Sequence, residues 1–189
     1  MKIKKLLKNG LSLFLTFIVI TSILDFVRRP VVPKEINKIT LQDLQGSTFS
    51  LDSLDQNKPT LLYFWGTWCG YCRYTSPAIN SLANEGYQVV SVALRSGNEA
   101  DVNDYLSKHD YHFTTVNDPK GEFAERWQIN VTPTIVLLSK GKMDLVTTGL
   151  TSYWGLKVRL FFKHFLNPLE DIIAHHQLIL NLTQFQSYH

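Results

Sequence analysis

The feature that most constrains this chain is a pair of cysteines, Cys69 and Cys72, that follows a continuous apolar run, Pro59–Trp65. The run has the length and the aromatic content of a buried central strand. A turn at Gly66–Trp68 separates it from a helical pattern that extends from Cys69 to about Glu85. The sequence therefore predicts that the two thiols lie where a buried strand passes, through a short turn, into a helix.

The spacing of the two cysteines indicates chemistry rather than a structural crosslink. They are the only cysteines among 189 residues, and a disulfide-stapled scaffold needs more of them. A bridge between residues so close in sequence also closes too short a loop to stabilise a fold by much. At the start of a helix, Cys69 gains from the helix dipole, which favours the thiolate that attacks disulfides. Cys72, one turn later on the same face, can then resolve the mixed disulfide.

Other uses of the two cysteines have less support. Half of a zinc site would need further cysteines or histidines, and no histidine lies near the motif in sequence. A Cu(I)-binding protein of copper tolerance stays open as the alternative function, because two soft thiolates suit that metal. Met1 and Met143 are the only methionines, so the sequence supplies no further sulfur beside the pair. A thiol peroxidase would carry threonine three residues before its reactive cysteine, where this chain has Gly66.

The N-terminal segment predicts membrane attachment. Residues 11–27 are apolar apart from a few hydroxyls and Asp25, at the short end of what spans a bilayer. Four lysines precede this run and two arginines follow it, so the N-terminus should remain cytoplasmic. A cleaved signal peptide would have the same layout, but no Ala-x-Ala pattern follows the run. We favour an uncleaved anchor over a cleaved peptide or a buried core helix.

The remaining pattern alternates between strands and helices. A hairpin is predicted at 40–51 around Gly46, and further strands and helices follow. This alternation predicts an α/β layer structure. No basic stripe follows a later helix, so nucleic-acid binding has little support. The predicted strands are 87–94, 134–138 and 143–148, and the predicted helices are 99–109, 122–127 and 154–165.

Several motifs at characteristic spacing resemble the thioredoxin superfamily. The segment FWGTWCGYC, Phe64–Cys72, resembles its active-site segment. Four further elements keep the spacing of that superfamily: Pro77, Thr132-Pro133, Gly141 and Gly149. The resemblance covers about residues 36–165 and implies a thioredoxin-like α/β fold. Such a fold has a central mixed β-sheet flanked by helices, here with an N-terminal hairpin and a strand–helix insertion.

Within the superfamily, the chain is most similar to the membrane-anchored TlpA/ResA branch. The long segment between Cys72 and Pro133 fits that branch, and the runs Ala93–Gly97 and Asn117–Glu122 resemble the suppressor-of-copper-sensitivity protein D group. The resemblance implies a single-pass protein of the bacterial inner membrane whose catalytic domain is periplasmic. It implies a protein-disulfide oxidoreductase, more as a reductase than an oxidase, with a membrane redox partner and a role in oxidative or metal stress. Its redox-active group would be the Cys69–Cys72 disulfide, without a further cofactor or metal.

The resemblance also suggests residues that touch substrate proteins. The backbone of Thr132, before a cis Pro133, would pair with an extended substrate chain. Trp68 would form part of an apolar docking surface, with a core indole as the alternative. Tyr71 would be exposed between the cysteines, and it and Gly70 would contact the substrate. Thioredoxin has a buried aspartate in its central strand where this chain has Tyr63.

These expectations divide the chain into five parts. They are a basic cytoplasmic segment at 1–10, a transmembrane signal anchor at 11–27, a linker at 28–35, a thioredoxin-like domain at 36–165 and a C-terminal helical extension at 166–189, to which the sequence assigns no role.

Overall fold

The computed structural model describes residues 16, 30, 31, 33, 39–51, 53, 54, 58–139 and 142–161. The chain divides into two compact units, Met1–Thr151 and Ser152–His189, which are described separately. Among the residues described, no helix is both long enough and apolar enough to cross a membrane. Except for Thr16, the predicted anchor lies outside these residues, as does the predicted extension at 166–189.

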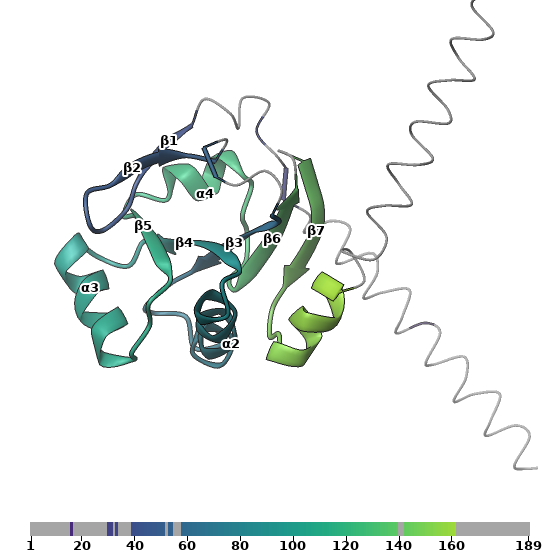
Figure 1. Ribbon diagram of the computed structural model, residues 1–189. Coiled ribbons are helices and arrows are strands. Elements are labelled where there is room, and N and C mark those ends of the chain that lie inside the picture. Colours follow the sequence, from purple (N-terminus) through teal and green to yellow (C-terminus); the bar gives the residue numbers. More distant parts are fainter. Residues whose placement is uncertain are drawn as a thin grey trace, which may run out of the picture. The chain divides into compact units, whose positions relative to one another are not determined.

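The first unit is built on a mixed five-stranded sheet with the strand order β5-β4-β3-β6-β7 (Figure 1). Strands β3, β4 and β5 run parallel to one another, whereas β6 is antiparallel to β3 and β7 is antiparallel to β6. This arrangement confirms the predicted α/β fold with a central mixed sheet. The strands are β3 (Thr60–Trp65), β4 (Gln88–Leu94), β5 (Thr114–Asp118), β6 (Thr134–Ser139) and β7 (Lys142–Thr148).

The apolar run identified in the sequence is the central strand of this sheet. All six residues of β3 are buried, because β4 and β6 flank the strand and helices cover both faces of the sheet (Figure 1). Successive side chains of a strand point to opposite faces. Leu62 and Phe64 therefore enter the core on one face, and Tyr63 and Trp65 point to the other.

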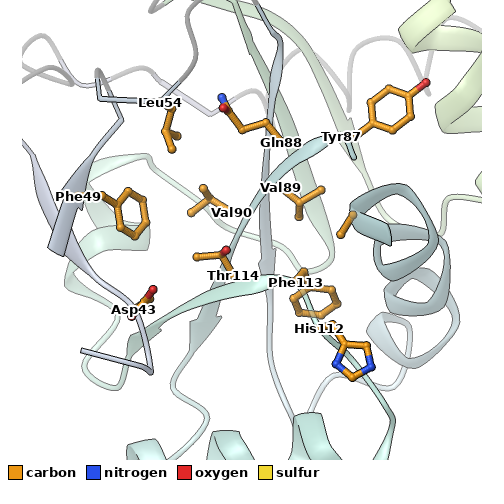
Figure 2. Close-up of a pocket in the computed structure, with 11 residues that line it drawn as sticks. Asp43, Phe49, Leu54, Tyr87, Gln88, Val89, Val90, His112, Phe113 and Thr114 are labelled. Atoms are coloured by element: carbon orange, nitrogen blue, oxygen red, sulfur yellow. The ribbon is translucent and has the colours of Figure 1, made fainter. Parts of the chain in front are cut away.

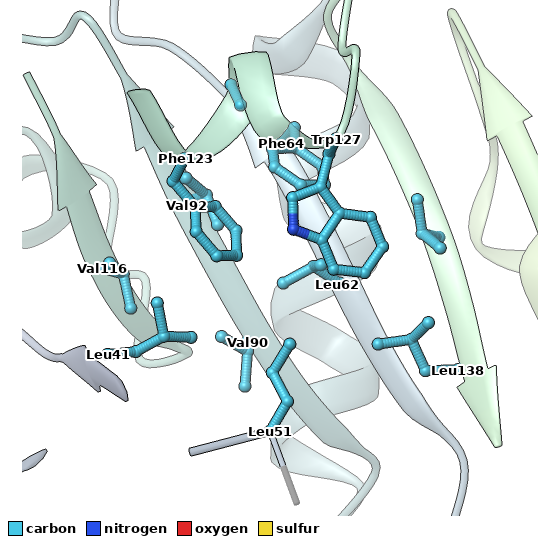
Figure 3. Packing of buried hydrophobic residues seen from close by; sticks show 12 residues of the cluster. Leu41, Leu51, Leu62, Phe64, Val90, Val92, Val116, Phe123, Trp127 and Leu138 are labelled. Atoms are coloured by element: carbon cyan, nitrogen blue, oxygen red, sulfur yellow. The ribbon is translucent and has the colours of Figure 1, made fainter. Parts of the chain in front are cut away.

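Three helices and a hairpin cover the two faces. Phe64 lies 6.0 Å, between ring centroids, from both Phe123 and Trp127, which belong to α4 and the residue after it (Figure 3). On the other face, Trp65 contacts Tyr105 of α3 at 5.4 Å. The core on the α4 side also includes Leu41, which belongs to the hairpin (Figure 3). The covering elements are α2 (Cys72–Asn84), α3 (Glu99–Lys108), α4 (Glu122–Arg126), β1 (Thr40–Gln42) and β2 (Thr48–Ser50).

The predicted hairpin at 40–51 is confirmed, and its turn explains its glycine. The Asp43 carboxylate accepts hydrogen bonds from the backbone N–H groups of Gln45 and Ser47, at 3.0 and 2.8 Å. Gly46 has φ +82°, a backbone conformation that side chains with a Cβ rarely adopt. The side-chain turn and the glycine together set the register of β1 against β2.

The structure differs from the sequence prediction at two points. The helix predicted from Cys69 begins at Cys72. Cys69 instead ends a turn, in which its N–H donates to the Gly66 carbonyl at 3.0 Å, and Gly70 and Tyr71 form a further turn before the helix. The strand β5, Thr114–Asp118, was not predicted from its polar sequence. It forms because it pairs with β4 along its whole length. In the second unit, residues 153–161 are helical, so the helix begins one residue before the helix predicted at 154–165.

Candidate active site

The two cysteines form a disulfide at the N-terminus of α2. Cys69 lies in the turn before the helix and Cys72 is its first residue, with the two Cα atoms 5.3 Å apart. Cys69 is 6% exposed and Cys72 is 1% exposed, so Cys69 is the more accessible of the two cysteines. The backbone N–H of Cys72 donates to Cys69 Sγ at 3.1 Å. A helix N-terminus therefore faces the sulfur that would carry negative charge after reduction.

A short hydrogen-bond network fixes the turn that carries Cys69. The N–H of Thr67 donates to the Ser96 hydroxyl at 3.0 Å, and that hydroxyl donates to the Leu94 carbonyl at 3.1 Å. The Trp68 indole N–H donates to the same carbonyl at 2.9 Å. The turn after β3 is thereby tied to the end of β4. The position of Cys69 is set by two neighbouring strands rather than by α2 alone.

Two more loops come to this end of the sheet. Phe64 pairs with Thr134, so the segment Thr132-Pro133 lies beside the end of β3 from which the disulfide turn departs. The Thr132-Pro133 peptide bond is cis, as the resemblance implied. The Pro133 carbonyl accepts a hydrogen bond from the N–H of Gly149 at 2.8 Å, which joins the loop after β7 to this segment.

The loop after β7 also reaches α2. The Thr151 N–H donates to the hydroxyl of Thr75, one turn along α2 from Cys72, at 3.4 Å. Both threonines are buried. The disulfide turn, the cis-proline segment and the loop after β7 therefore meet around the first turn of α2.

Large apolar side chains are exposed on these segments. Trp68, Tyr71 and Tyr74 are 59%, 68% and 66% exposed, and we call these three residues the aromatic rim. Leu150, in the loop after β7, is 64% exposed. The predicted exposure of Tyr71 and the predicted burial of Trp65 are confirmed, and the exposure of Trp68 shows that this indole is not part of the core. The sequence analysis missed Tyr74 and Leu150, because neither lies in a recognised motif. Only their closeness in sequence, of Tyr74 to Cys72 and of Leu150 to Gly149, could have suggested them.

Tyr63 stands at the strand position that bears aspartate in thioredoxin, and its hydroxyl forms a neutral pair with that of Ser76. The Tyr63 hydroxyl lies 2.8 Å from the hydroxyl of Ser76, and both residues are fully buried. Ser76 follows Cys72 by one helical turn, on the same side of α2. Burial raises the pKa of Tyr63 well above its usual value of 10.0, and the hydrogen bond between Tyr63 and Ser76 opposes that shift only in part.

A pocket near the sheet lies away from the disulfide. A cavity of about 390 Å³ is lined by the hairpin, by the start of β4 and by the residues that lead into β5 (Figure 2). Because β3, β4 and β5 are parallel, these strand starts lie at the edge opposite to the disulfide turn. Within the described residues, no three His, Cys, Asp or Glu side chains gather as ligands for a metal ion. The pocket is therefore separate from the disulfide and from the aromatic rim.

Comparison with known proteins identifies the family. The model of the AhpC/TSA family matches residues 32–147, which is more than half of the chain. The chain belongs to the AhpC/TSA family. A thioredoxin-like protein of Haemophilus influenzae is 96% identical over 165 residues, which cover 87% of this chain and 99% of that one. The thiol-disulfide oxidoreductase ResA of Oceanobacillus iheyensis is 28% identical over 113 residues, 57% of this chain and 58% of ResA.

Solved structures agree with this family assignment. A secreted disulfide oxidoreductase of Mycobacterium tuberculosis, homologous to E. coli DsbE, superimposes with a TM-score of 0.58 at 26% identity. The match covers 67% of this chain and 97% of that protein. The predicted thioredoxin-like fold and the enzyme class, thiol–disulfide oxidoreductase, are thus confirmed. The relatives are of the ResA and DsbE type, and the narrower suppressor-of-copper-sensitivity group stays a prediction.

Proposed function

We propose that this oxidoreductase works as a reductase of disulfides in other proteins. The observation that carries the proposal is the small number of groups, among the described residues, that could stabilise a Cys69 thiolate. In the described part of the chain, the N–H of Cys72 is the hydrogen-bond donor to Cys69 Sγ, and neither Gly70 nor Tyr71 brings a charge. Arg73, the charged residue next to the motif in sequence, has its guanidinium 5.6 Å over the ring of Tyr74, so its charge contacts that ring. A strong oxidant stabilises its reduced form, so weak thiolate stabilisation favours a low potential and donation of electrons.

In the proposed reaction, two electrons pass from the enzyme to the substrate. The Cys69 thiolate attacks one sulfur of a substrate disulfide, and the other substrate sulfur leaves as a thiolate and takes up a proton. Cys72 loses its proton and attacks Cys69 Sγ in the mixed disulfide. This step forms the Cys69–Cys72 bond and releases the second substrate thiol. The burial of Cys72 supports this order, because a substrate sulfur has better access to Cys69.

We propose that the aromatic rim and Leu150 dock the substrate chain. Exposed apolar side chains gathered at one place indicate an interaction surface. Tyrosine and tryptophan give large contact areas at low conformational cost. The cis-proline segment would add main-chain hydrogen bonds to an extended peptide, so the substrate class is an extended or flexible polypeptide around a cystine.

We further propose that residues 11–27 anchor the protein in the bacterial inner membrane, with the catalytic domain in the periplasm. The lysines before this run and the arginines after it support that orientation. A membrane partner would then return electrons to the disulfide. Membership of the suppressor-of-copper-sensitivity protein D group, with a role in oxidative or metal stress, is supported by the runs Ala93–Gly97 and Asn117–Glu122.

The reduction potential of the Cys69–Cys72 couple tests the direction of transfer. The full-length protein, in a mild nonionic detergent, is equilibrated against dithiothreitol and glutathione buffers, and its thiols are counted by alkylation. We expect a value near or below about −250 mV, in the range of reductases. A value of about −150 mV or higher would show an oxidase or isomerase. Failure to observe a reversible couple would overturn the exchange mechanism, and Cu(I) binding by the two thiolates would then be measured.

A further inference from the structure

The helix of the second unit exposes a face of large apolar side chains. Residues 153–161 are helical, and Trp154, Val158 and Phe161 are 73%, 51% and 67% exposed. Steps of four and three residues in a helix of 3.6 residues per turn bring these side chains within an arc of about 60°. Leu156 and Leu160 lie on the opposite side of the same helix and are buried. The exposed stripe is therefore additional to the face that the helix already buries.

Basic residues flank this stripe, which we call the 154–161 face. Lys157 and Arg159 lie on its two sides, and the Lys157 ammonium lies 5.6 Å over the ring of Tyr153. From Leu145 to Leu169 the sequence contains no acidic residue. The face thus joins exposed aromatic rings to positive charge, with no negative charge from its own segment.

We propose that the 154–161 face lies on an anionic phospholipid surface. A helix with apolar aromatic residues on one face and basic residues beside it binds in the plane of a membrane interface. Tryptophan prefers the headgroup level, and lysine and arginine are attracted to anionic headgroups. A second copy of the chain fits less well, because a two-fold contact uses the same patch of both copies and would bring the basic residues Lys157 and Arg159 of the two copies together. The proposal rests on the second unit and is independent of the redox function.

Brominated lipids provide the test, because they quench the fluorescence of a tryptophan that enters the interface. The full-length protein is mixed with vesicles of phosphatidylcholine containing about one third phosphatidylglycerol, and with vesicles of phosphatidylcholine alone. The share of emission due to Trp154 is obtained by comparison with Trp154→Phe, which keeps an apolar ring. All variants retain residues 11–27, so any contribution of that segment is the same in each.

We expect the emission of Trp154 to be quenched in the anionic vesicles and much less in the neutral ones. With Lys157→Gln and Arg159→Gln together, the ratio of lipid-bound to free helix should fall on the order of 30-fold. A rise in salt from about 0.1 to about 1 M should have a similar effect. The control variant, Lys108→Gln with Lys142→Gln, removes the same charge from the first unit and should leave the quenching of Trp154 unchanged.

Three results would overturn the proposal. Equal quenching in neutral and anionic vesicles would show that the basic residues take no part. Absence of quenching together with concentration-dependent crosslinking through position 154 would identify a second copy as the occupant. Absence of quenching, with slow amide hydrogen exchange of 153–161 in solution at all concentrations, would show that other residues of the chain cover the face.

Discussion

The buried pair formed by Tyr63 and Ser76 gives the sharpest quantitative prediction. Both side chains are fully buried and their hydroxyl oxygens lie 2.8 Å apart. Tyr63→Phe or Ser76→Ala removes one hydroxyl and leaves the other buried without its partner, which costs about 1–3 kcal/mol. When both hydroxyls are removed, no polar atom is left unpaired, and the cost should approach zero. The double variant should therefore be more stable than either single variant.

The expected coupling follows from these values. If each single substitution lowers the free energy of unfolding by about 2 kcal/mol, additivity predicts a loss of about 4 kcal/mol for the double variant. The structure predicts a loss below about 1 kcal/mol instead, so the coupling energy should be about 3 kcal/mol. Alanine is a better helix former than serine by a few tenths of a kcal/mol, which slightly lowers the cost of Ser76→Ala. The exposed Ser81 on the same helix provides a control for that contribution.

Urea unfolding of the oxidised full-length protein at neutral pH measures the four free energies. Ser81→Ala should lie within about 0.5 kcal/mol of the parent protein. Additive losses in the double variant would refute the reasoning, because they would mean that each hydroxyl is satisfied independently, for example by water. If all the variants changed the slope of the unfolding free energy with urea by the same amount, the loss of stability would be assigned to the unfolded chain rather than to the hydroxyl pair.

Three further predictions concern the same site. In Gly66→Ala the new Cβ would lie 2.7 Å from the Trp68 ring, so the Trp68–Leu94 hydrogen bond should break. Thermal unfolding should show a loss of stability of about 1 kcal/mol. Gly70→Ala is the control, because the space around Gly70 is open, and its stability should be nearly unchanged. Cys72→Ser should accumulate mixed disulfides with substrate proteins on nonreducing gels, and Cys69→Ser should not. Above pH 10 the unfolded chain loses the Tyr63 proton that the folded chain keeps, because burial raises the pKa of Tyr63. Stability should therefore fall by about 1.4 kcal/mol per pH unit there, and urea unfolding of Tyr63→Phe should lack that contribution.

The sequence predicted those elements whose burial follows from local pattern. The run Pro59–Trp65 is continuous, apolar and bounded by turn residues, so it could be recognised as a central strand before any partner was known. The alternation of strands and helices then limited the architecture to an α/β sheet. Cys69 and Cys72 could be assigned from their spacing alone, because no other residue type performs disulfide exchange.

The strand β5 could not be predicted because tertiary contacts bury its polar residues. Thr115 is buried through a hydrogen bond of 2.9 Å between its hydroxyl and that of Ser91, on the neighbouring strand. The Asp118 carboxylate accepts the backbone N–H groups of Phe123 and Ala124, at 3.2 and 2.9 Å. These polar side chains resemble those of a loop in sequence, and only their partners in other elements make burial favourable. The same limit applies to Leu150, which reaches the site through the fold of another segment.

Tyr63 shows how a departure from the thioredoxin pattern can be compatible with the same fold. The alternation of β3 points residue 63 toward α2, where a carboxylate would need a charged or proton-sharing partner. A tyrosine hydroxyl needs only one neutral partner, and Ser76 supplies it from the helix turn after Cys72. Because burial raises the pKa of Tyr63, its hydroxyl stays protonated throughout the range in which thiols titrate. Tyr63 therefore adds no charge beneath the disulfide in that range. A break in the pH dependence of the reduction potential below pH 10 should then be assigned to Cys69 or Cys72, and it should persist in Tyr63→Phe.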